Sequence, residues 1–156
     1  MSAERFVSLL KDRKLKVATA ESVTGGLIAA SIVDIPGSSK VLGEAYVAYS
    51  LEAKTKVLGI NPALFLSHEV VSERIALEMA KGLKRKTSVD VVIATTGIAG
   101  PDGGTKTIPV GTVCIAIGYK ELFHTETLHL TGTRNEIRKA AVEAAFASSI
   151  QIILGA

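Results

Sequence analysis

Short apolar runs rich in β-branched residues alternate along this chain with segments whose apolar residues recur every three or four positions. The short runs predict five strands, at residues 16–20, 43–50, 89–95, 111–118 and 121–130. The segments with helical spacing predict helices at residues 3–13, 25–33, 52–58, 72–84 and 133–154, with a further short helix after Asn61-Pro62. Thr133 and Glu136 have the spacing of a capping box at the start of the last helix.

The order of these elements predicts the architecture. Strands interleave with helices, which favours a three-layer α/β/α sandwich. Residues 89–95 and 111–118 are almost continuously apolar, as expected of strands covered on both faces. The last two strands are joined only by Tyr119-Lys120 and should pair antiparallel, so the sheet should be mixed. No repeat or linker interrupts the 156 residues, and we expect a single domain over 1–156.

Composition narrows the possible functions. Hydrophobic residues make up 47% of the chain and aromatic residues only 4%, so the core should be aliphatic. The net charge of +3 is spread along the sequence, without the basic face and stacking aromatics typical of nucleic-acid binding. We expect the one basic cluster, Lys81–Lys86, to be the solvated end of a helix, where cations complement the dipole.

Several absences suggest a cytoplasmic protein without membrane contact. The only cysteine, Cys114, lies in an apolar run and should be a buried thiol, which fits a reducing compartment. The N-terminus lacks the apolar core of a signal peptide. No apolar run approaches the ~20 residues that a membrane span requires.

Residues 20–26, Ala-Glu-Ser-Val-Thr-Gly-Gly, form the first candidate site. They stand between a strand and a helix, where glycine N–H groups and the helix N-terminus could bind an anion. The alternative is an ordinary turn whose helix is capped by Ser22 or Thr24. The stretch alone does not favour either interpretation.

Two more polar loops, Pro36–Ser39 and Thr96–Gly104, could join the first in a ligand site. Loops at the carboxyl ends of strands line the ligand crevice in open α/β sheets. These three loops carry hydroxyl groups and glycines, which suit a phosphate or a carbonyl oxygen better than a metal ion. His68, His124 and His129 lack the spacing of metal ligands, so we expect no metal site.

Because no histidine is clearly placed beside a serine, lysine is the remaining candidate for a base. A desolvated lysine can accept the proton of a serine hydroxyl. Lys54 is the best placed, one helical turn beyond a predicted strand, although spacing alone favours an ordinary solvent-facing lysine. Arg134 and Arg138 share a helical face and could clamp an anion, but surface charge is the favoured interpretation for them too.

Together these motifs resemble a known family. In order they are Ala20–Gly26, Pro36–Ser39, Tyr-Ser-Leu-Glu-Ala-Lys at 49–54, Thr96–Gly104 and Pro-Val-Gly-Thr at 109–112. The set is similar to the CinA carboxy-terminal domain family, whose characterised activity is deamidation of nicotinamide mononucleotide. The similarity covers essentially the whole chain, which looks like the stand-alone members rather than those fused behind a larger domain.

The resemblance implies a serine amidohydrolase with a Ser/Lys dyad and neither metal nor cofactor. It places the nucleophile on Ser39 and the base on Lys54, with Ser22 as the rival nucleophile. Tyr49, Ser22 and Thr96 look like supporting active-site groups. The residues expected to hold the pyridine mononucleotide substrate are Thr24, Gly25, Gly26, Thr96, Gly97, Gly100 and Arg134.

Two positions depart from the family pattern. Val23 stands where the family often has Cys, and Leu51 stands where it has Asn. The loss of an amide near Lys54 motivates a second hypothesis, a non-catalytic module with a nucleotide-binding or regulatory role. A purely structural interaction domain is a third. The apolar composition and small size also make a homo-oligomer plausible.

Overall fold

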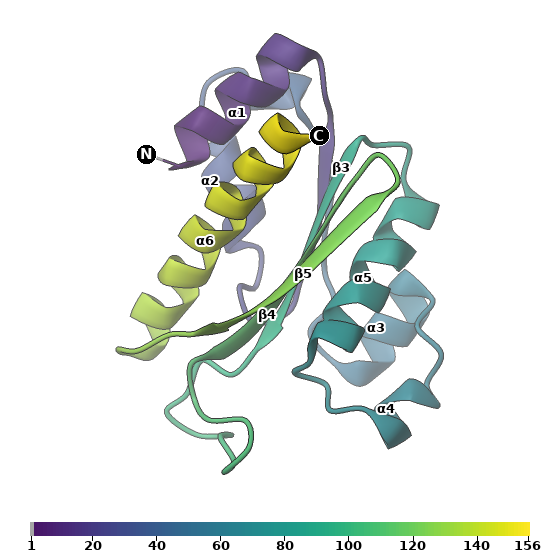
Figure 1. The fold of residues 1–156 in the computed structure, drawn as a ribbon, viewed down its shortest axis with the longest axis vertical. Helices are drawn as coiled ribbons and strands as arrows, with labels where there is room; N and C mark the ends of the chain where they lie inside the picture. The colour runs from purple at the N-terminus through teal and green to yellow at the C-terminus, as the bar shows by residue number, and fades with distance from the viewer. Residues whose placement is uncertain (1) are drawn as a thin grey trace.

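A mixed β-sheet forms the middle layer of the structure, a computed structural model that describes residues 2–156 (Figure 1). Its five strands are β1 (Val17–Glu21), β2 (Leu42–Val47), β3 (Val91–Gly97), β4 (Thr112–Tyr119) and β5 (Leu122–His129). In space their order is β2-β1-β3-β4-β5. β1 pairs in parallel with β2 and β3, whereas β4 pairs antiparallel with β3 and β5. The mixed sheet predicted from the short turn at Tyr119-Lys120 is therefore confirmed.

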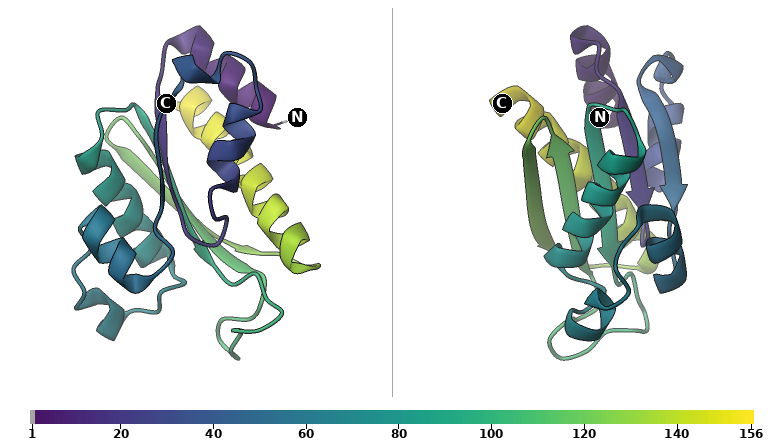
Figure 2. Two further views of the ribbon diagram at one scale, coloured as in Figure 1. Left: turned by 180° about the vertical axis from the view of Figure 1, so that it is seen from behind. Right: turned by 90° about the vertical axis from the view of Figure 1, so that its right-hand side faces the viewer.

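Helices cover both faces of the sheet, which confirms the three-layer arrangement (Figure 2). They are α1 (Ser2–Arg13), α2 (Leu27–Val33), α3 (Leu51–Leu58), α4 (Leu64–Ser67), α5 (Glu73–Lys86) and α6 (Arg134–Gly155), with a 3-10 turn, η1 (Ser38–Lys40). α1, α2 and α6 pack together on one face, and α3 packs with α5 on the other. Thr133 and Glu136 form the predicted capping box of α6.

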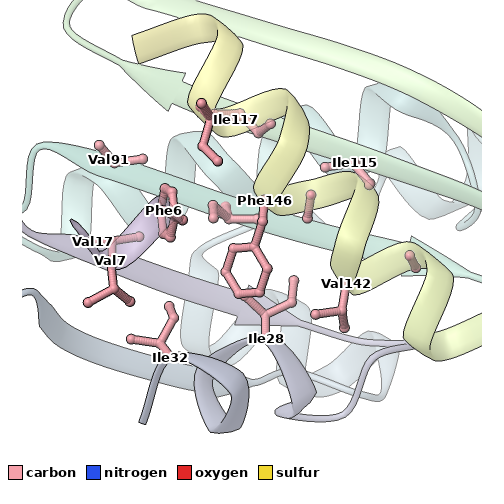
Figure 3. Close-up of a cluster of buried hydrophobic side chains, with 14 of the residues drawn as sticks. Phe6, Val7, Val17, Ile28, Ile32, Val91, Ile115, Ile117, Val142 and Phe146 are labelled. Atoms are coloured by element: carbon pink, nitrogen blue, oxygen red, sulfur yellow. The ribbon is translucent and has the colours of Figure 1, made fainter. Parts of the chain in front are cut away.

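The two faces of the sheet carry side chains of different size. Strand residues such as Val17, Ile93 and Ile115 join Phe6 and Phe146 in an aliphatic and aromatic core beneath α1, α2 and α6 (Figure 3). On the opposite face the strand residues are mostly small: Ala18, Ala20, Ala94, Cys114 and Ala116. These small side chains let α5 lie close to the strands. The buried thiol expected at Cys114 is found there, 2% exposed.

The strand directions bring three loops to one edge of the sheet. Because β1, β2 and β3 are parallel and Glu21 pairs with both Val47 and Thr95, their carboxyl ends lie side by side. β2 is added on one side of β1 and β3 on the other, so the strand order reverses beside β1. Open α/β sheets bind ligands at such a reversal. The loops that leave these three strands start at Ser22, Ala48 and Ile98.

Gly82 allows α3 to lie against α5. A Cβ atom at Gly82 would overlap the carbonyl oxygen of Leu58, near the end of α3. We expect Gly82→Ala to lower the free energy of unfolding by about 2 kcal/mol, because a side chain here forces the two helices apart. Urea denaturation measures this loss.

Gly155→Ala is the matched control, since a Cβ atom there would meet no atom within 4 Å. It should change stability by less than about 0.5 kcal/mol. Equal stability of the Gly82→Ala and wild-type proteins would contradict the close packing of α3 on α5.

Candidate active site

The turn between β1 and α2 presents Ser22 at the carboxyl edge of the sheet. The Ser22 N–H donates to the Thr95 carbonyl at 3.2 Å, which extends the pairing of β1 with β3 by one residue. The Gly25 N–H then donates back to the Ser22 carbonyl at 3.0 Å. Gly25 and Gly26 have φ values of 59° and 98°, a left-handed backbone that favours glycine. The two glycines thus close the turn tightly around Ser22, which is 7% exposed.

Glu21 occupies the N-terminus of α2. Its carboxylate is fully buried and accepts the N–H groups of Ile28 at 2.8 Å and Ala29 at 3.1 Å. A helix N-terminus with free N–H groups attracts anions, but here the chain supplies its own. Of the two interpretations of residues 20–26, phosphate binding at this helix end is therefore not supported. Nor do Ser22 or Thr24 cap the helix, since the carboxylate of Glu21 does so.

Lys54 lies on the buried side of α3 and points back to the same edge. Ser50 caps the helix by accepting the N–H of Ala53 at 3.0 Å. Lys54 is 1% exposed, so the alternative of a solvent-facing lysine is wrong. Its Nζ donates to Ser22 Oγ at 2.9 Å, to the Ala48 carbonyl at 3.1 Å and to the Tyr49 carbonyl at 3.2 Å.

Burial lowers the pKa of Lys54 from 10.5 to about 8. Removal from water disfavours the ammonium form, and no carboxylate among residues 2–156 forms an ion pair with it. The two carbonyl groups can only accept hydrogen bonds, so they hold both hydrogens of the neutral amine. The lone pair of the neutral amine is then directed at Ser22, whose hydroxyl becomes the donor. This is the geometry of a base poised to activate a serine.

A network of buried groups fixes the position of Ser22. Thr24 Oγ1 and Thr95 Oγ1 lie 2.9 Å apart, and the Ser22 N–H also approaches Thr95 Oγ1 at 3.4 Å. From α6, Arg138 donates to the carbonyls of Val23 at 3.1 Å and Thr24 at 2.9 Å. The sequence had offered Arg138 only as a possible anion clamp, and it gave no signal that Thr95 faces this turn.

A pocket of about 180 Å³ opens next to Ser22 and Lys54; it is lined by Val23 and Tyr49, which neighbour them, and not by the two residues themselves. Its walls come from the turns after β1 and β2, the glycine-rich loop after β3 and the start of α6; they include Val23, Tyr49, Gly97, Gly100, Asp102 and Arg134. Arg134 donates to the Gly100 carbonyl at 2.6 Å and lies 3.5 Å from the Tyr49 hydroxyl. Thr96 is buried elsewhere, with its hydroxyl donating to the Val70 carbonyl at 3.2 Å. Of the expected binding residues, Gly97, Gly100 and Arg134 line the pocket, whereas Thr24, Gly25, Gly26 and Thr96 do not.

The expected pairing of Ser39 with Lys54 does not occur in the structure. Ser39 lies in η1, before β2, whereas Lys54 follows the carboxyl end of β2. The six residues of β2 separate them by about 20 Å of extended strand. Ser39 is exposed and makes no contact with Lys54. The rival serine, Ser22, is the one that lies beside Lys54 Nζ.

Within residues 2–156 no three His, Cys, Asp or Glu side chains gather where they could hold a metal ion. None of the helices in the same range is both long and apolar enough to cross a membrane.

Comparisons with known proteins agree with the fold. The family model described as "CinA C-terminal domain" matches residues 1–153. The chain is 50% identical over 117 residues to a CinA-like protein of Chlorobaculum tepidum, covering 75% of this chain and 28% of that protein. It is 53% identical over 114 residues to a CinA-like protein of Chloroherpeton thalassium, covering 73% and 27%. The chain thus spans about a third of the length of the curated relatives it matches.

Solved structures match over nearly their whole length. The crystal structure of a competence/damage inducible protein from Agrobacterium tumefaciens superposes with a TM-score of 0.93 at 36% identity, covering 96% of this chain and 92% of that one. A competence or damage-inducible protein from Enterobacter asburiae gives a TM-score of 0.90 at 31% identity, with 94% and 92% covered.

The lowered pKa of Lys54 predicts a dependence of stability on pH. Between pH 8 and 10.5 the unfolded chain binds more protons at Lys54 than the folded chain, so stability rises with pH. Relative to Lys54→Met, the wild-type protein should gain about 2 kcal/mol in unfolding free energy between pH 7 and 9.5. Urea denaturation of both proteins at the two pH values measures the gain. A constant difference between them would contradict the lowered pKa.

Proposed function

Because the chain belongs to the CinA C-terminal domain family, we propose that it hydrolyses the carboxamide of nicotinamide mononucleotide to nicotinic acid mononucleotide and ammonia. The observation that carries the proposal is the buried contact of 2.9 Å between Lys54 Nζ and Ser22 Oγ. A lysine with a lowered pKa beside a serine at a sheet edge is a competent nucleophile–base pair.

In the proposed reaction, Ser22 rather than Ser39 is the nucleophile. Neutral Lys54 takes the hydroxyl proton while Ser22 Oγ attacks the carboxamide carbon. The tetrahedral intermediate collapses as the Lys54 ammonium returns the proton to the leaving nitrogen, which departs as ammonia. Lys54 then deprotonates a water molecule that cleaves the acyl-enzyme ester, and the proton finally returns to Ser22.

The turn itself offers donors for the oxyanion. The N–H groups of Val23 and Thr24 donate to no other group of residues 2–156. The N–H of the residue after a nucleophile is a common oxyanion donor, and here it belongs to Val23. The Gly25 N–H already donates to the Ser22 carbonyl, so it is not free to bind the oxyanion. The role of Gly25 is to shape the turn.

The pocket suits the pyridine end of the substrate better than the whole nucleotide. Its volume of about 180 Å³ is below the 300–1,000 Å³ usual for complete ligand sites. We assign the ring to the hollow next to Val23 and the phosphate to the exposed rim. Arg134, held by the Gly100 carbonyl, is the cation of the pocket lining and our candidate contact for the phosphate, although Asp102 lies in the same lining.

No observation favours the non-catalytic alternative. Leu51, the substitution that suggested it, is the first residue of α3 and is 45% exposed. Its side chain lines an apolar hollow with Phe65 and Leu66 and is absent from the contacts of Lys54 Nζ. The base is fixed by backbone carbonyls, so loss of an amide at position 51 leaves the dyad intact.

Substitution of the dyad tests the proposal. We expect Ser22→Ala and Lys54→Ala each to lower ammonia release from nicotinamide mononucleotide by about a thousandfold or more, because each removes half of one catalytic unit. Ser39→Ala is the matched control and should stay within about twofold of wild type, since Ser39 is exposed and far from the dyad. Full turnover by folded Ser22→Ala would disprove the assignment.

The rate should also follow the protonation of Lys54. Only the neutral amine accepts a proton, so kcat/KM for deamidation should rise with pH through about 8 and level off above it. Lys54→Arg, which stays charged over this range, should be inactive throughout. A profile that is flat between pH 6 and 9 would argue against Lys54 as the base.

A further inference from the structure

Four lysines surround a hollow at the amino edge of the sheet, the end opposite the dyad. The hollow has a volume of about 370 Å³ and is lined by Leu10, Lys11, Lys14, Lys16 and Lys40. Every lining residue except Leu10 carries a positive charge. The lysines come from the end of α1, the turn into β1 and the end of η1.

Backbone geometry holds these lysines around the hollow. Lys14 has a φ of 57°, a left-handed conformation in the position after a helix where glycine is favoured. Lys16 Nζ donates to the Lys40 carbonyl at 3.4 Å, which joins the β1 side of the hollow to η1. Lys11 lies over Gly37, since a Cβ atom there would stand 2.9 Å from Lys11 Nζ. The Pro36–Ser39 motif, which the proposed reaction does not use, thus forms part of this wall.

The ammonium groups of the hollow have no carboxylate in direct contact among the described residues. None of the four lysines forms an ion pair within residues 2–156. The carboxylate nearest in the hydrogen-bond network, Asp90, accepts the backbone N–H of Lys16 at 2.8 Å and pairs with no lysine side chain. A concave surface lined by one sign of charge concentrates ions of the opposite sign.

A second basic hollow offers a contrast. It is lined by Lys81, Lys84, Arg85 and Lys120, but it also holds Glu121 and the ring of Phe123. Lys84 Nζ is already engaged there, donating to the Lys120 carbonyl and lying 5.5 Å from the centre of the Phe123 ring. Of these two hollows, the first has no acid in its lining, and its Lys11, Lys14 and Lys40 ammonium groups form no ion pair within residues 2–156.

We propose that the hollow lined by Lys11, Lys14, Lys16 and Lys40 binds a small anion with two or more phosphate groups, such as pyrophosphate or a nucleoside diphosphate. Its volume lies within the range of small-molecule sites, and four ammonium donors can contact several phosphate oxygens at once. The residues between Lys16 and Ser22 span about 20 Å of extended chain, so this anion site is separate from the proposed active site.

Titration calorimetry with inorganic pyrophosphate and with ADP tests the site. The wild-type protein should bind pyrophosphate, and Lys11→Gln/Lys40→Gln should weaken binding by about tenfold or more, because it removes two of the four charges. Lys84→Gln/Lys120→Gln is the matched control from the second basic hollow and should bind as the wild type does. Similar affinity for ADP would identify the diphosphate as the recognised group, whereas much tighter binding of ADP would add a nucleoside contact.

Amide chemical shifts locate the ligand. Pyrophosphate should move the resonances of Gly37, Ser38 and Lys40 and leave those of Ser22 and Gly97 in place. The proposal fails if the wild-type protein gives no binding, if both double variants bind equally, or if the shifts fall at Ser22. It also fails if single-stranded DNA displaces pyrophosphate at equal phosphate concentration, since the lysines would then form a polymer-binding surface.

Discussion

The contact between a buried lysine and a serine at the carboxyl edge of the sheet is the constraint on which the site depends. Burial removes water from Lys54, and three oxygen atoms replace it. Two of them are backbone carbonyls, whose positions follow from the path of the chain after β2. The amine of Lys54, the proposed base, is therefore oriented by the fold itself, without a carboxylate partner of the kind that orients histidine in a catalytic triad.

The rest of the fold supports this contact from three directions. The pairing of β1 with β3 places Ser22 against Thr95. On a second side, α5 packs against α3, the helix that carries Lys54, at a close approach that Gly82 allows. From the third side, Arg138 of α6 holds the carbonyls of Val23 and Thr24. Elements far apart in the sequence therefore converge on a turn of a few residues.

Apolar periodicity predicted nearly every element to within three residues, because apolar spacing reports directly on burial. The order of these elements predicted the layers, and the short turn at Tyr119-Lys120 predicted the mixed sheet. These patterns could not choose between Ser22 and Ser39, since that choice depends on which end of a strand each serine occupies in space. The burial of Lys54 was missed for a similar reason. A lysine at a core position of a short helix has no sequence signal that separates it from a surface lysine. The contact of Thr95 with Ser22 and Thr24 was also missed, because in the sequence Thr95 is only the last residue of the apolar strand 89–95.

Glu21 has a consequence for how such folds are recognised. Strand–turn–helix units with paired glycines are often taken as phosphate cradles, because their helix N-termini are open to solvent. Here the last residue of the strand is an acid that folds back onto the helix. The acid at this strand terminus thus takes the helix N–H groups that an anionic ligand would otherwise use, and the hydroxyl of the next residue, Ser22, faces Lys54 instead.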